Sequence, residues 1–318
     1  MTMSEARQTV GSAHTGMLLW ALIVGLSFPA VGLMSEGLPP LLLTAMRFTI
    51  ASLALWPLVR RAPAFRPSRQ GLVLYVLMGL CTAGFFGAMF WAAHRATALS
   101  MSTLYVSVPL LAYGLGRLFG VERRAGGLLA ILALGAGGAL ALAWAGKAGQ
   151  AGGLQLGAGE TAFFLGCLGS ALYPVLTKWG LARGWLPDGA GVRTFWSLVV
   201  GAVLVGLMGL AAEAPRALAA MTVSDILLVA YLGVFSSGVT YWLMQRGTGA
   251  LTPGAVTAYT YLVPFVSVVL VVVGEPERMG WQWVPGSLMV VLAIALLLRR
   301  PVDPPATPAA PRRCAASS

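Results

Sequence analysis

Long apolar runs separated by short polar segments dominate the chain. A helix that crosses a bilayer needs roughly 20 mostly apolar residues, and ten runs come close to that length. Five precede a glycine-rich segment at 146–159 and five follow it; the ten runs are 17–34, 39–58, 71–93, 99–116, 125–145, 161–177, 189–212, 226–244, 251–274 and 281–298. This pattern predicts an all-α integral membrane protein with ten transmembrane helices.

The second half of the chain repeats the first. Trp91 and Arg95 are separated from Trp242 and Arg246 by the same 151 positions. Because each half has an odd number of spans, the two copies must lie upside down relative to each other in the membrane. Two inverted five-helix repeats are a recurrent architecture of secondary transporters, with the substrate site near the midplane where the repeats meet.

Prolines recur at matching places in both halves. The first span of each half contains an aromatic-proline pair, Phe28-Pro29 or Tyr173-Pro174, and the fourth is broken by one proline, Pro109 or Pro264. A proline inside a span removes one backbone hydrogen bond and frees a carbonyl, which is tolerated only where protein, water or ligand reaches it. We therefore expect these prolines to lie beside a pathway.

The repeat divides the chain into five parts. Their predicted bounds are a cytoplasmic N-terminal tail at 1–15, the first five-helix repeat at 16–145, a glycine-rich external linker at 146–158, the second five-helix repeat at 159–298, and a disordered proline-rich cytoplasmic tail at 299–318. The run at 17–34 is longer than a signal-peptide core and has a counterpart in the second half, so we interpret it as a span.

Composition supports a membrane protein. Of 318 residues, 58% are hydrophobic and only 10% are charged, and the mean hydropathy is +0.82. The net charge is +11, but the basic residues stand between apolar runs rather than on a soluble domain. This distribution indicates cytoplasmic loops of a membrane protein and argues against a nucleic-acid partner.

Basic residues also predict the orientation, because cytoplasmic loops retain Lys and Arg. With the N-terminus inside, fifteen of the 21 fall on the cytoplasmic side and four outside, leaving two within spans. The external four are Arg95, Lys147, Arg216 and Arg278, and the two within spans are Arg47 and Arg193. Both termini are therefore expected in the cytoplasm.

Arg47 lies near the middle of its span, where an arginine costs about 3 kcal/mol or more. It must face water or a partner, either an anion in the pathway or backbone carbonyls of a kinked neighbouring helix. Arg193, its match in the second half, lies only a turn into its span. We expect that Arg193 could extend to the interface.

Aromatic side chains complete the set of candidate pathway residues. Phe28 and Tyr173 stand beside prolines in the middle of spans and are expected to line a cavity, whereas Trp91 and Trp242 lie near span ends and could equally be interfacial belt residues. The whole set is Phe28, Pro29, Arg47, Trp91, Tyr105, Pro109, Tyr173, Pro174, Tyr241, Trp242, Tyr259 and Pro264.

Acidic residues are absent from all ten runs. The nearest stand at span ends, where Asp225 is predicted to be a helix N-cap and Glu160 is the best available candidate for proton coupling. The two histidines, His14 in the tail and His94 at an interface, provide no catalytic set and no metal site. No cofactor is expected.

Together these motifs resemble the drug/metabolite transporter (DMT) superfamily, and specifically its EamA-type ten-helix permeases. The resemblance covers residues 16–298 and rests on the order of the motifs in both halves, including LTAMRFTIASLAL around Arg47 and VPFVSVVLVVVGE after Tyr261. It implies two EamA-like repeats whose first, third and fourth spans surround a central cavity. It also implies transport of small metabolites.

The sequence thus predicts a secondary transporter or permease of the cell inner (plasma) membrane. It would move a small metabolite, either amino acid-like or a drug-like amphiphile, with export as the expected direction. The expected partners are the small-molecule substrate and the lipid bilayer, with a homodimer as a further possibility. A non-transporting membrane scaffold and an integral membrane enzyme are the alternatives, although a scaffold would not need proline-broken spans at matching positions.

Overall fold

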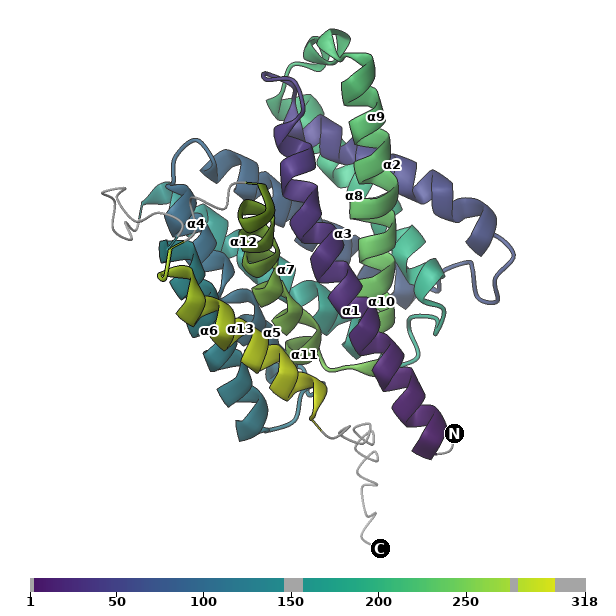
Figure 1. The fold of residues 1–318 in the computed structure, drawn as a ribbon. Coiled ribbons are helices and arrows are strands. Elements are labelled where there is room, and N and C mark those ends of the chain that lie inside the picture. The colour runs from purple at the N-terminus through teal and green to yellow at the C-terminus, as the bar shows by residue number, and fades with distance from the viewer. Residues whose placement is uncertain (1–2, 146–156, 275–279, 301–318) are drawn as a thin grey trace, which may run out of the picture.

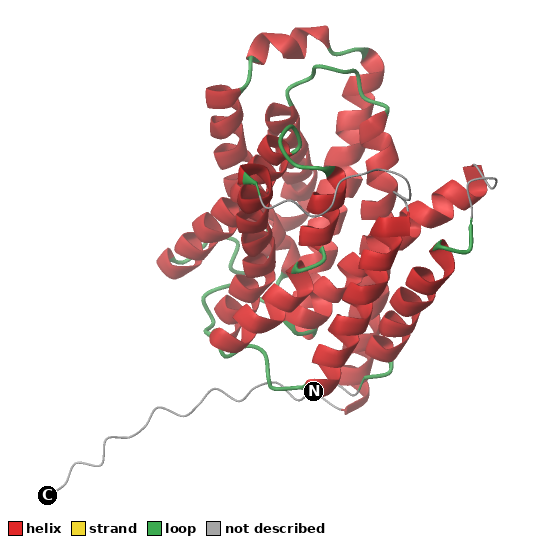
Figure 2. Ribbon diagram, turned by 90° about the vertical axis from the view of Figure 1, so that its left-hand side faces the viewer, coloured by secondary structure: helices red, strands yellow, loops and turns green. Residues whose placement is uncertain are grey.

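The computed structural model describes residues 3–145, 157–274 and 280–300, and all regular elements within them are helices (Figure 2). The first half contains α1 (Met3–Gly32), α2 (Pro40–Val59), α3 (Arg69–Ala92), α4 (Ala98–Tyr105), α5 (Val108–Leu118) and α6 (Gly126–Ala145). The second half contains α7 (Ala158–Ala182), α8 (Ala190–Ala212), η1 (Pro215–Ala220), α9 (Val223–Tyr231), the π-helix η2 (Leu232–Val239), α10 (Thr240–Ala250), α11 (Pro253–Ala258), η3 (Tyr259–Tyr261), α12 (Leu262–Gly274) and α13 (Trp283–Leu298).

Ten spans can be recognised among these helices. Eight helical segments are long and apolar enough to cross a membrane, counting α9–η2–α10 and most of α11–η3–α12 as one each. The remaining two predicted spans correspond to the broken pair α4–α5 and to α13, which has 16 residues. The all-helical, ten-span prediction is confirmed. Most of the predicted linker at 146–158 and C-terminal tail at 299–318 lies outside the described residues.

Helix α1 begins well before the predicted first span. It starts at Met3, so most of the predicted tail at 1–15 is helical. Ala13 and His14 are buried there, and this packing stabilises a helix that hydropathy alone does not reveal. The tail position predicted for His14 is therefore wrong, because its ring lies inside the protein.

The fourth span of each half breaks just before its proline. In the first half α4 ends at Tyr105 and α5 begins at Val108, with Pro109 as its second residue. In the second half η3 interrupts the span and Pro264 is the third residue of α12. A proline costs little in the first turn of a helix, because the N–H it lacks would have no helical partner there.

Several contacts between a helix of the first half and a helix of the second are matched by a contact between their counterparts in the opposite halves, as a two-fold relation between the halves would produce. Helix α3 packs on α7 as α1 packs on α10, and α5 packs on α7 as α1 packs on α12. Helices α2 and α8, and likewise α6 and α13, pack on their own counterparts. Figure 1 shows α1 running beside α10, and α6 beside α13.

The crossing of α6 and α13 shows this relation at single-residue level. A Cβ on Gly138 would lie 2.9 Å from the Gly286 carbonyl, and a Cβ on Gly286 would lie 2.9 Å from the Gly138 carbonyl. The two backbones touch through positions that only glycine can occupy, as at small-residue crossings of membrane helices. This reciprocal contact between matching glycines supports a duplicated fold.

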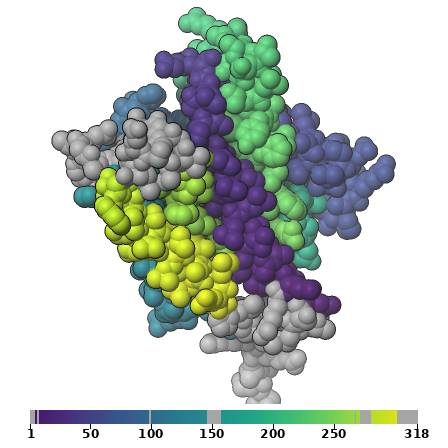
Figure 3. Space-filling view, viewed as in Figure 1, coloured from purple at the N-terminus to yellow at the C-terminus, as the bar shows by residue number. Residues whose placement is uncertain are grey.

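Much of the molecular surface is apolar. On the visible face α1 crosses between the α9–α10 segment and α12–α13 (Figure 3). Leu18, Leu19 and Leu22 of α1 are exposed, as are leucines and valines on most other long helices. In a water-soluble protein such surface would be a liability, whereas lipid tails solvate it.

Candidate functional site

A chain of side-chain hydrogen bonds joins α7, α8 and α10. Gln245 donates from Nε2 to the Tyr173 hydroxyl at 2.9 Å and to Thr177 Oγ1 at 3.3 Å. Ser197 donates its proton to the Thr194 carbonyl, so the Tyr173 hydroxyl is the donor in its 2.8 Å contact with Ser197. Each donor in this chain has an acceptor, and such a satisfied network rigidifies the protein around it.

Arg193 anchors the same network. Its Nε donates to Gln245 Oε1 at 3.0 Å and its Nη2 to the Gln245 carbonyl at 2.8 Å. Its Nη1 donates to the carbonyls of Pro187 and Asp188 at 2.6 and 2.7 Å. Arg193 is only 1% exposed, so the expectation that it could extend to the interface is wrong. Neutral acceptors surround the guanidinium and hold the Gln245 amide in one orientation.

Tyr241 connects this network to the first half of the chain. Its ring centroid lies 5.6 Å from that of Tyr173 and 5.6 Å from that of Phe48 on α2, both in edge-to-face geometry. It also packs against a hydrophobic cluster that includes Phe48 and Ala51 of α2 and Ala83 of α3. Tyr241 therefore contacts α2 and α3 of the first repeat as well as α7 of its own.

Further rings extend from this point. Phe86 lies 5.6 Å from Phe48, Phe85 lies 5.3 Å from Phe86, and Tyr105 lies 5.8 Å from Phe85, measured between centroids. Contacts of this kind stabilise by about 0.5–1.5 kcal/mol each beyond area burial. We call the six residues the central aromatic cluster: Phe48, Phe85, Phe86, Tyr105, Tyr173 and Tyr241.

The prolines of the aromatic-proline pairs lie inside uninterrupted helices. Pro29 belongs to α1 and Pro174 to α7, so each leaves the carbonyl four residues earlier, at Gly25 or Ser170, without its helical donor. Pro174 directly follows Tyr173 of the central aromatic cluster on α7. The second-half proline thus lies beside the site.

The two aromatic-proline pairs have different surroundings. Phe28 is 60% exposed, whereas Tyr173 is 4% exposed. Phe28 lies on the same face of α1 as Ala13, Met17 and Ala21, which are buried nearer the N-terminus of the helix. That face of α1 is the one directed toward the rest of the protein. The bundle is therefore packed around Tyr173 and open around Phe28.

Arg47 is held less completely than Arg193. Its Nη2 donates to Ser236 Oγ on η2 at 3.0 Å, and its Nε is buried without a partner. Helix α2 approaches η2 closely here, since a Cβ on Gly233 would lie 2.9 Å from Ile50 and 3.1 Å from the Arg47 carbonyl. Among the described residues no backbone carbonyl accepts from the Arg47 guanidinium, so the structure gives no support to an arginine held by the carbonyls of a kinked neighbouring helix.

The paired tryptophans stack on the arginines one turn after them. The Arg95 guanidinium carbon lies 4.2 Å from the Trp91 ring centroid, and that of Arg246 lies 5.6 Å from the Trp242 centroid. Such cation–π pairs explain why both residues recur together in each half. Trp91 is largely exposed and Trp242 half-buried, neither contacts the central aromatic cluster, and their placement favours the belt interpretation.

Tyr259 lies in a different part of the protein. It is fully buried, and its hydroxyl is 2.6 Å from Nδ1 of His14. Both belong to a core formed chiefly by α1, α6, α11, η3, α12 and α13. The structure therefore brings together Arg47, Tyr105, Tyr173 and Tyr241 of the predicted set, and leaves Tyr259 apart from them.

Carboxylates at span ends bind backbone N–H groups. Glu160 accepts from the Gly157 N–H at 3.2 Å at the start of α7. Asp225 accepts from the Thr222 N–H at 2.8 Å and from the Ser35 N–H at 2.9 Å. Asp225 is thus the third residue of a capping box and Thr222 is the N-cap, which corrects the predicted role of Asp225.

Two further acids act in the same way across the repeats. Glu213, at the end of α8, accepts from the N–H groups of Leu41 and Leu42 at the start of α2 at 2.7 and 2.9 Å. Glu122 accepts from the Gly254 N–H at the start of α11 at 3.0 Å. Negative charge is favourable at helix N-termini, so these four carboxylates are used as caps.

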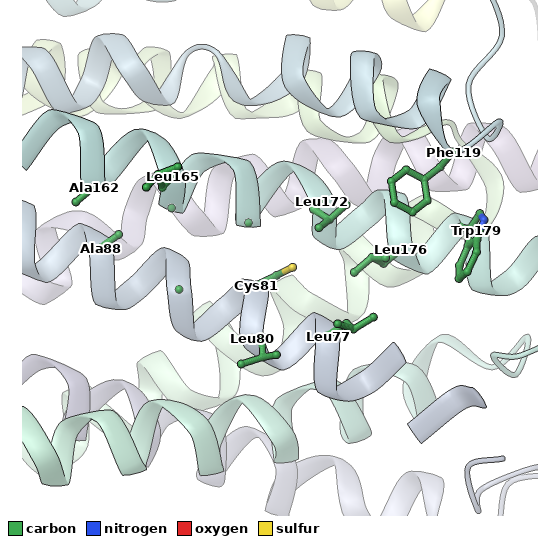
Figure 4. Close-up of a pocket in the computed structure, with 13 residues that line it drawn as sticks. Leu77, Leu80, Cys81, Ala88, Phe119, Ala162, Leu165, Leu172, Leu176 and Trp179 are labelled. Atoms are coloured by element: carbon green, nitrogen blue, oxygen red, sulfur yellow. The ribbon is translucent and has the colours of Figure 1, made fainter. Parts of the chain in front are cut away.

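An apolar groove of about 520 Å³ runs between α3 and α7. Figure 4 shows Cys81 on α3 pointing toward Leu172 and Leu176 on α7, with Leu77 and Leu80 on the same stretch of α3. Leu77 and Leu80 are also exposed at the molecular surface. Its described lining is almost entirely apolar, with the Trp179 indole and the Cys81 thiol as weakly polar groups, so it is not the candidate binding site.

Residues 11–144 and 157–299 each match the EamA-like transporter family. The chain belongs to the EamA-like transporter family. This membership confirms the resemblance found in the sequence and the duplication of the fold, and it excludes the membrane-enzyme alternative.

Similar proteins agree with the assignment. The "Uncharacterized inner membrane transporter YedA" of Escherichia coli (strain K12) is 26% identical to this EamA-like protein over 293 residues, which are 89% of this chain and 90% of that protein. The proteins of the same name from E. coli O6:H1 and O157:H7 match equally. A solved crystal structure shares the fold, with a TM-score of 0.73 at 21% identity over 93% of this chain and 96% of that chain.

Sequence analysis of this EamA-like protein missed several residues of the site. Gln245 lies one turn after Tyr241 in a stretch that the repeat had already singled out, but only charged and aromatic residues were weighed there. A polar amide directly after the run at 226–244, one turn from Tyr241, was the available signal. Ser197 and Ser236 gave no comparable signal, since serines are common in membrane helices.

Glu160→Gln is expected to leave transport by this EamA-like protein largely intact. The carboxylate accepts one backbone hydrogen bond at a helix end, and the Gln Oε1 can accept the same bond. The loss should therefore be less than about 1 kcal/mol of stability, with solute counterflow in proteoliposomes close to wild type. Loss of pH-driven uptake with preserved counterflow would instead identify Glu160 as a coupling residue.

Proposed function

We propose that the protein is a secondary transporter of the inner membrane that exports a small amphiphilic metabolite, amino acid-like or drug-like. The observation that carries the proposal is the position of Tyr241, which packs on Tyr173 of the hydrogen-bonded network in the second repeat and on residues of α2 and α3 in the first. Inverted-repeat transporters bind their substrates where the repeats meet.

The chemistry of this region suits an amphiphile. The central aromatic cluster offers ring faces and edges to an apolar group, and ligand sites are mostly apolar with a few placed polar groups. Tyr173, Gln245 and Arg47 supply polar groups beside it. Pro174 and the open surroundings of Phe28 fit a pathway that is packed at one end and accessible at the other, as alternating access requires.

The charge distribution supports an orientation with both termini in the cytoplasm. In that orientation the packed end around Tyr173 and Arg193 faces the cytoplasm and the open end around Phe28 faces outward. The curated relatives carry "inner membrane transporter" in their names, which supports the same membrane for this chain. A homodimer remains a prediction: Gly166, a small residue that could have served an interface, packs against Ala88 within the same chain.

Growth rescue tests the proposed function. Host cells challenged with panels of amino acids and toxic amphiphiles, with and without this protein, should tolerate higher concentrations of at least one compound when it is present. Tyr241→Ala should reduce that rescue about tenfold or more, because it removes two ring contacts worth about 0.5–1.5 kcal/mol each. Tyr241→Phe keeps both rings and serves as the control.

The readout must be normalised to folded protein, measured by gel filtration in detergent. Rescue that is independent of Tyr241, or no rescue by a well-expressed wild-type protein across both panels, would contradict the proposal. The second outcome would favour a membrane scaffold.

A further inference from the structure

Arg47 carries a charge that nothing in the described structure neutralises. Its one hydrogen bond goes to the neutral hydroxyl of Ser236, and its Nε is the only charged group among the described buried polar atoms that lack a partner. Guanidinium has five N–H donors in a planar fork, so most of the donors of Arg47 are unused. Arg193 uses four hydrogen bonds for the same group.

The acids that could pair with Arg47 are used elsewhere. No apolar run contains Asp or Glu, and Glu122, Glu160, Glu213 and Asp225 cap helix N-termini. An arginine at the centre of a bilayer is expensive, and such residues mark ion or substrate pathways. An intermittent partner, present only when solute is bound, would explain why the side chain is kept.

The opposing element supports a binding role. Ser236 belongs to the π-helix η2, and π-helical turns within α-helices are frequent at functional sites. Ser237, the next residue on η2, also has a buried hydroxyl without a partner. Gly233 lets α2 approach this turn closely. Unused donors are therefore present on both sides of the contact between α2 and η2.

We propose that Arg47 and η2 form a binding site for the carboxylate of the transported solute, an inference that rests on the proposed transport function. A carboxylate matches the arginine fork through two parallel N–H···O bonds. A phosphate dianion would leave one charge unbalanced, since the described residues place no second cation beside Arg47. Phe48, the residue after Arg47 on α2, has its ring 5.6 Å from that of Tyr241 in the central aromatic cluster, so we expect the solute also to carry an apolar or aromatic group.

Ligand binding to the purified full-length protein tests this site. The probes are 3-phenylpropanoate and octanoate, each compared with its neutral amide and with phenyl phosphate, and binding is measured by thermal shift over a concentration series. At least one carboxylate should stabilise the wild type at lower concentration than its amide. Arg47→Met should weaken that binding about tenfold or more, since it removes charge-assisted hydrogen bonds to the carboxylate, and Arg95→Met should not.

Two milder variants keep the test decisive if Arg47→Met does not fold. Arg47→Lys keeps the charge but loses the planar fork of N–H donors, so it should weaken carboxylate binding. Ser236→Ala frees the one donor of Arg47 that is already bonded, so it should not abolish carboxylate binding. Equal binding of acids and amides, tighter binding of phenyl phosphate, or unchanged affinity in Arg47→Lys would overturn the site. Carboxylate binding that depends on Arg47 without any solute transport would uphold the site and refute the transport function. Transport of neutral amphiphiles alone would uphold the transport function and refute the carboxylate site.

Discussion

Arg193→Met is expected to be the most destabilising single change in the site. It would leave the Gln245 side-chain oxygen and three backbone carbonyls without their donor. Buried groups left unpaired cost about 1–3 kcal/mol each, so a total loss of about 3 kcal/mol or more is expected. Since 1 kcal/mol corresponds to roughly 2–4 °C in a domain somewhat smaller than this chain, the melting temperature in detergent should fall by about 6–12 °C.

Arg47→Met is the matched control, because it removes the same group from the other repeat. Only one hydrogen bond to a hydroxyl is lost, while a costly charge leaves the membrane interior. The melting temperature without solute should therefore stay the same or rise. A similar loss of stability in both variants would show that Arg47 has structural partners equivalent to those of Arg193, and would count against a free anion site.

Pro29→Ala and Pro174→Ala are expected to impair transport while leaving the protein folded. Each substitution restores a backbone donor to the carbonyl of Gly25 or Ser170. The restored hydrogen bond is worth about 0.5–1.5 kcal/mol. If it forms more fully in the inward-facing or the outward-facing conformation, it shifts the ratio of these two conformations by up to about tenfold. If the prolines shape related gates at opposite ends of the pathway, the two variants should favour opposite-facing conformations and both should lose turnover.

The accessibility of introduced cysteines measures the conformational shift in each proline variant separately. In a background without Cys81, Cys167 and Cys314, single cysteines at Val31, after Pro29, and at Leu181, after Pro174, can be labelled from either side of intact cells or inverted vesicles. The two proline variants should change these labelling rates in opposite directions. Unchanged labelling together with normal transport in both would remove Phe28, Pro29, Tyr173 and Pro174 from the site.

The same reagents test the orientation. In the orientation that the basic residues predict, an impermeant reagent outside intact cells reaches Val31 and not Leu181. The reverse pattern would invert the topology and with it the assignment of the packed end to the cytoplasm.

Hydropathy and internal repetition were sufficient to predict the fold. Helix number, duplication and the breaks before Pro109 and Pro264 depend on local sequence, since run length and proline act on the helix that contains them. The start of α1 was missed because it depends on packing of Ala13 and His14 against distant helices. Hydropathy carries no information about such contacts.

The site was predictable only in part, for a similar reason. Arg47 and Arg193 look equivalent in the sequence, yet Arg47 has one hydrogen bond, to Ser236, and Arg193 has four. The difference arises because their partners lie elsewhere in the chain. Phe28 and Tyr173 also look equivalent, but phenylalanine has no hydroxyl with which to form the network of Tyr173. Repeated sequence predicts repeated helices. In one conformation of a duplicated carrier, however, side chains at matching positions of the two halves can have different partners.

The use of carboxylates as helix caps bears on how the membrane potential would act on transport. Because the ten apolar runs contain no Asp or Glu, we expect a transport cycle that carries no proton and moves only the charge of its solute. A monoanion leaving a cell whose interior is negative gains about 2.3 kcal/mol per 100 mV, which corresponds to an outward concentration ratio of roughly 50. Voltage alone would then drive the extrusion of a carboxylate, and an amino acid zwitterion would gain nothing from it.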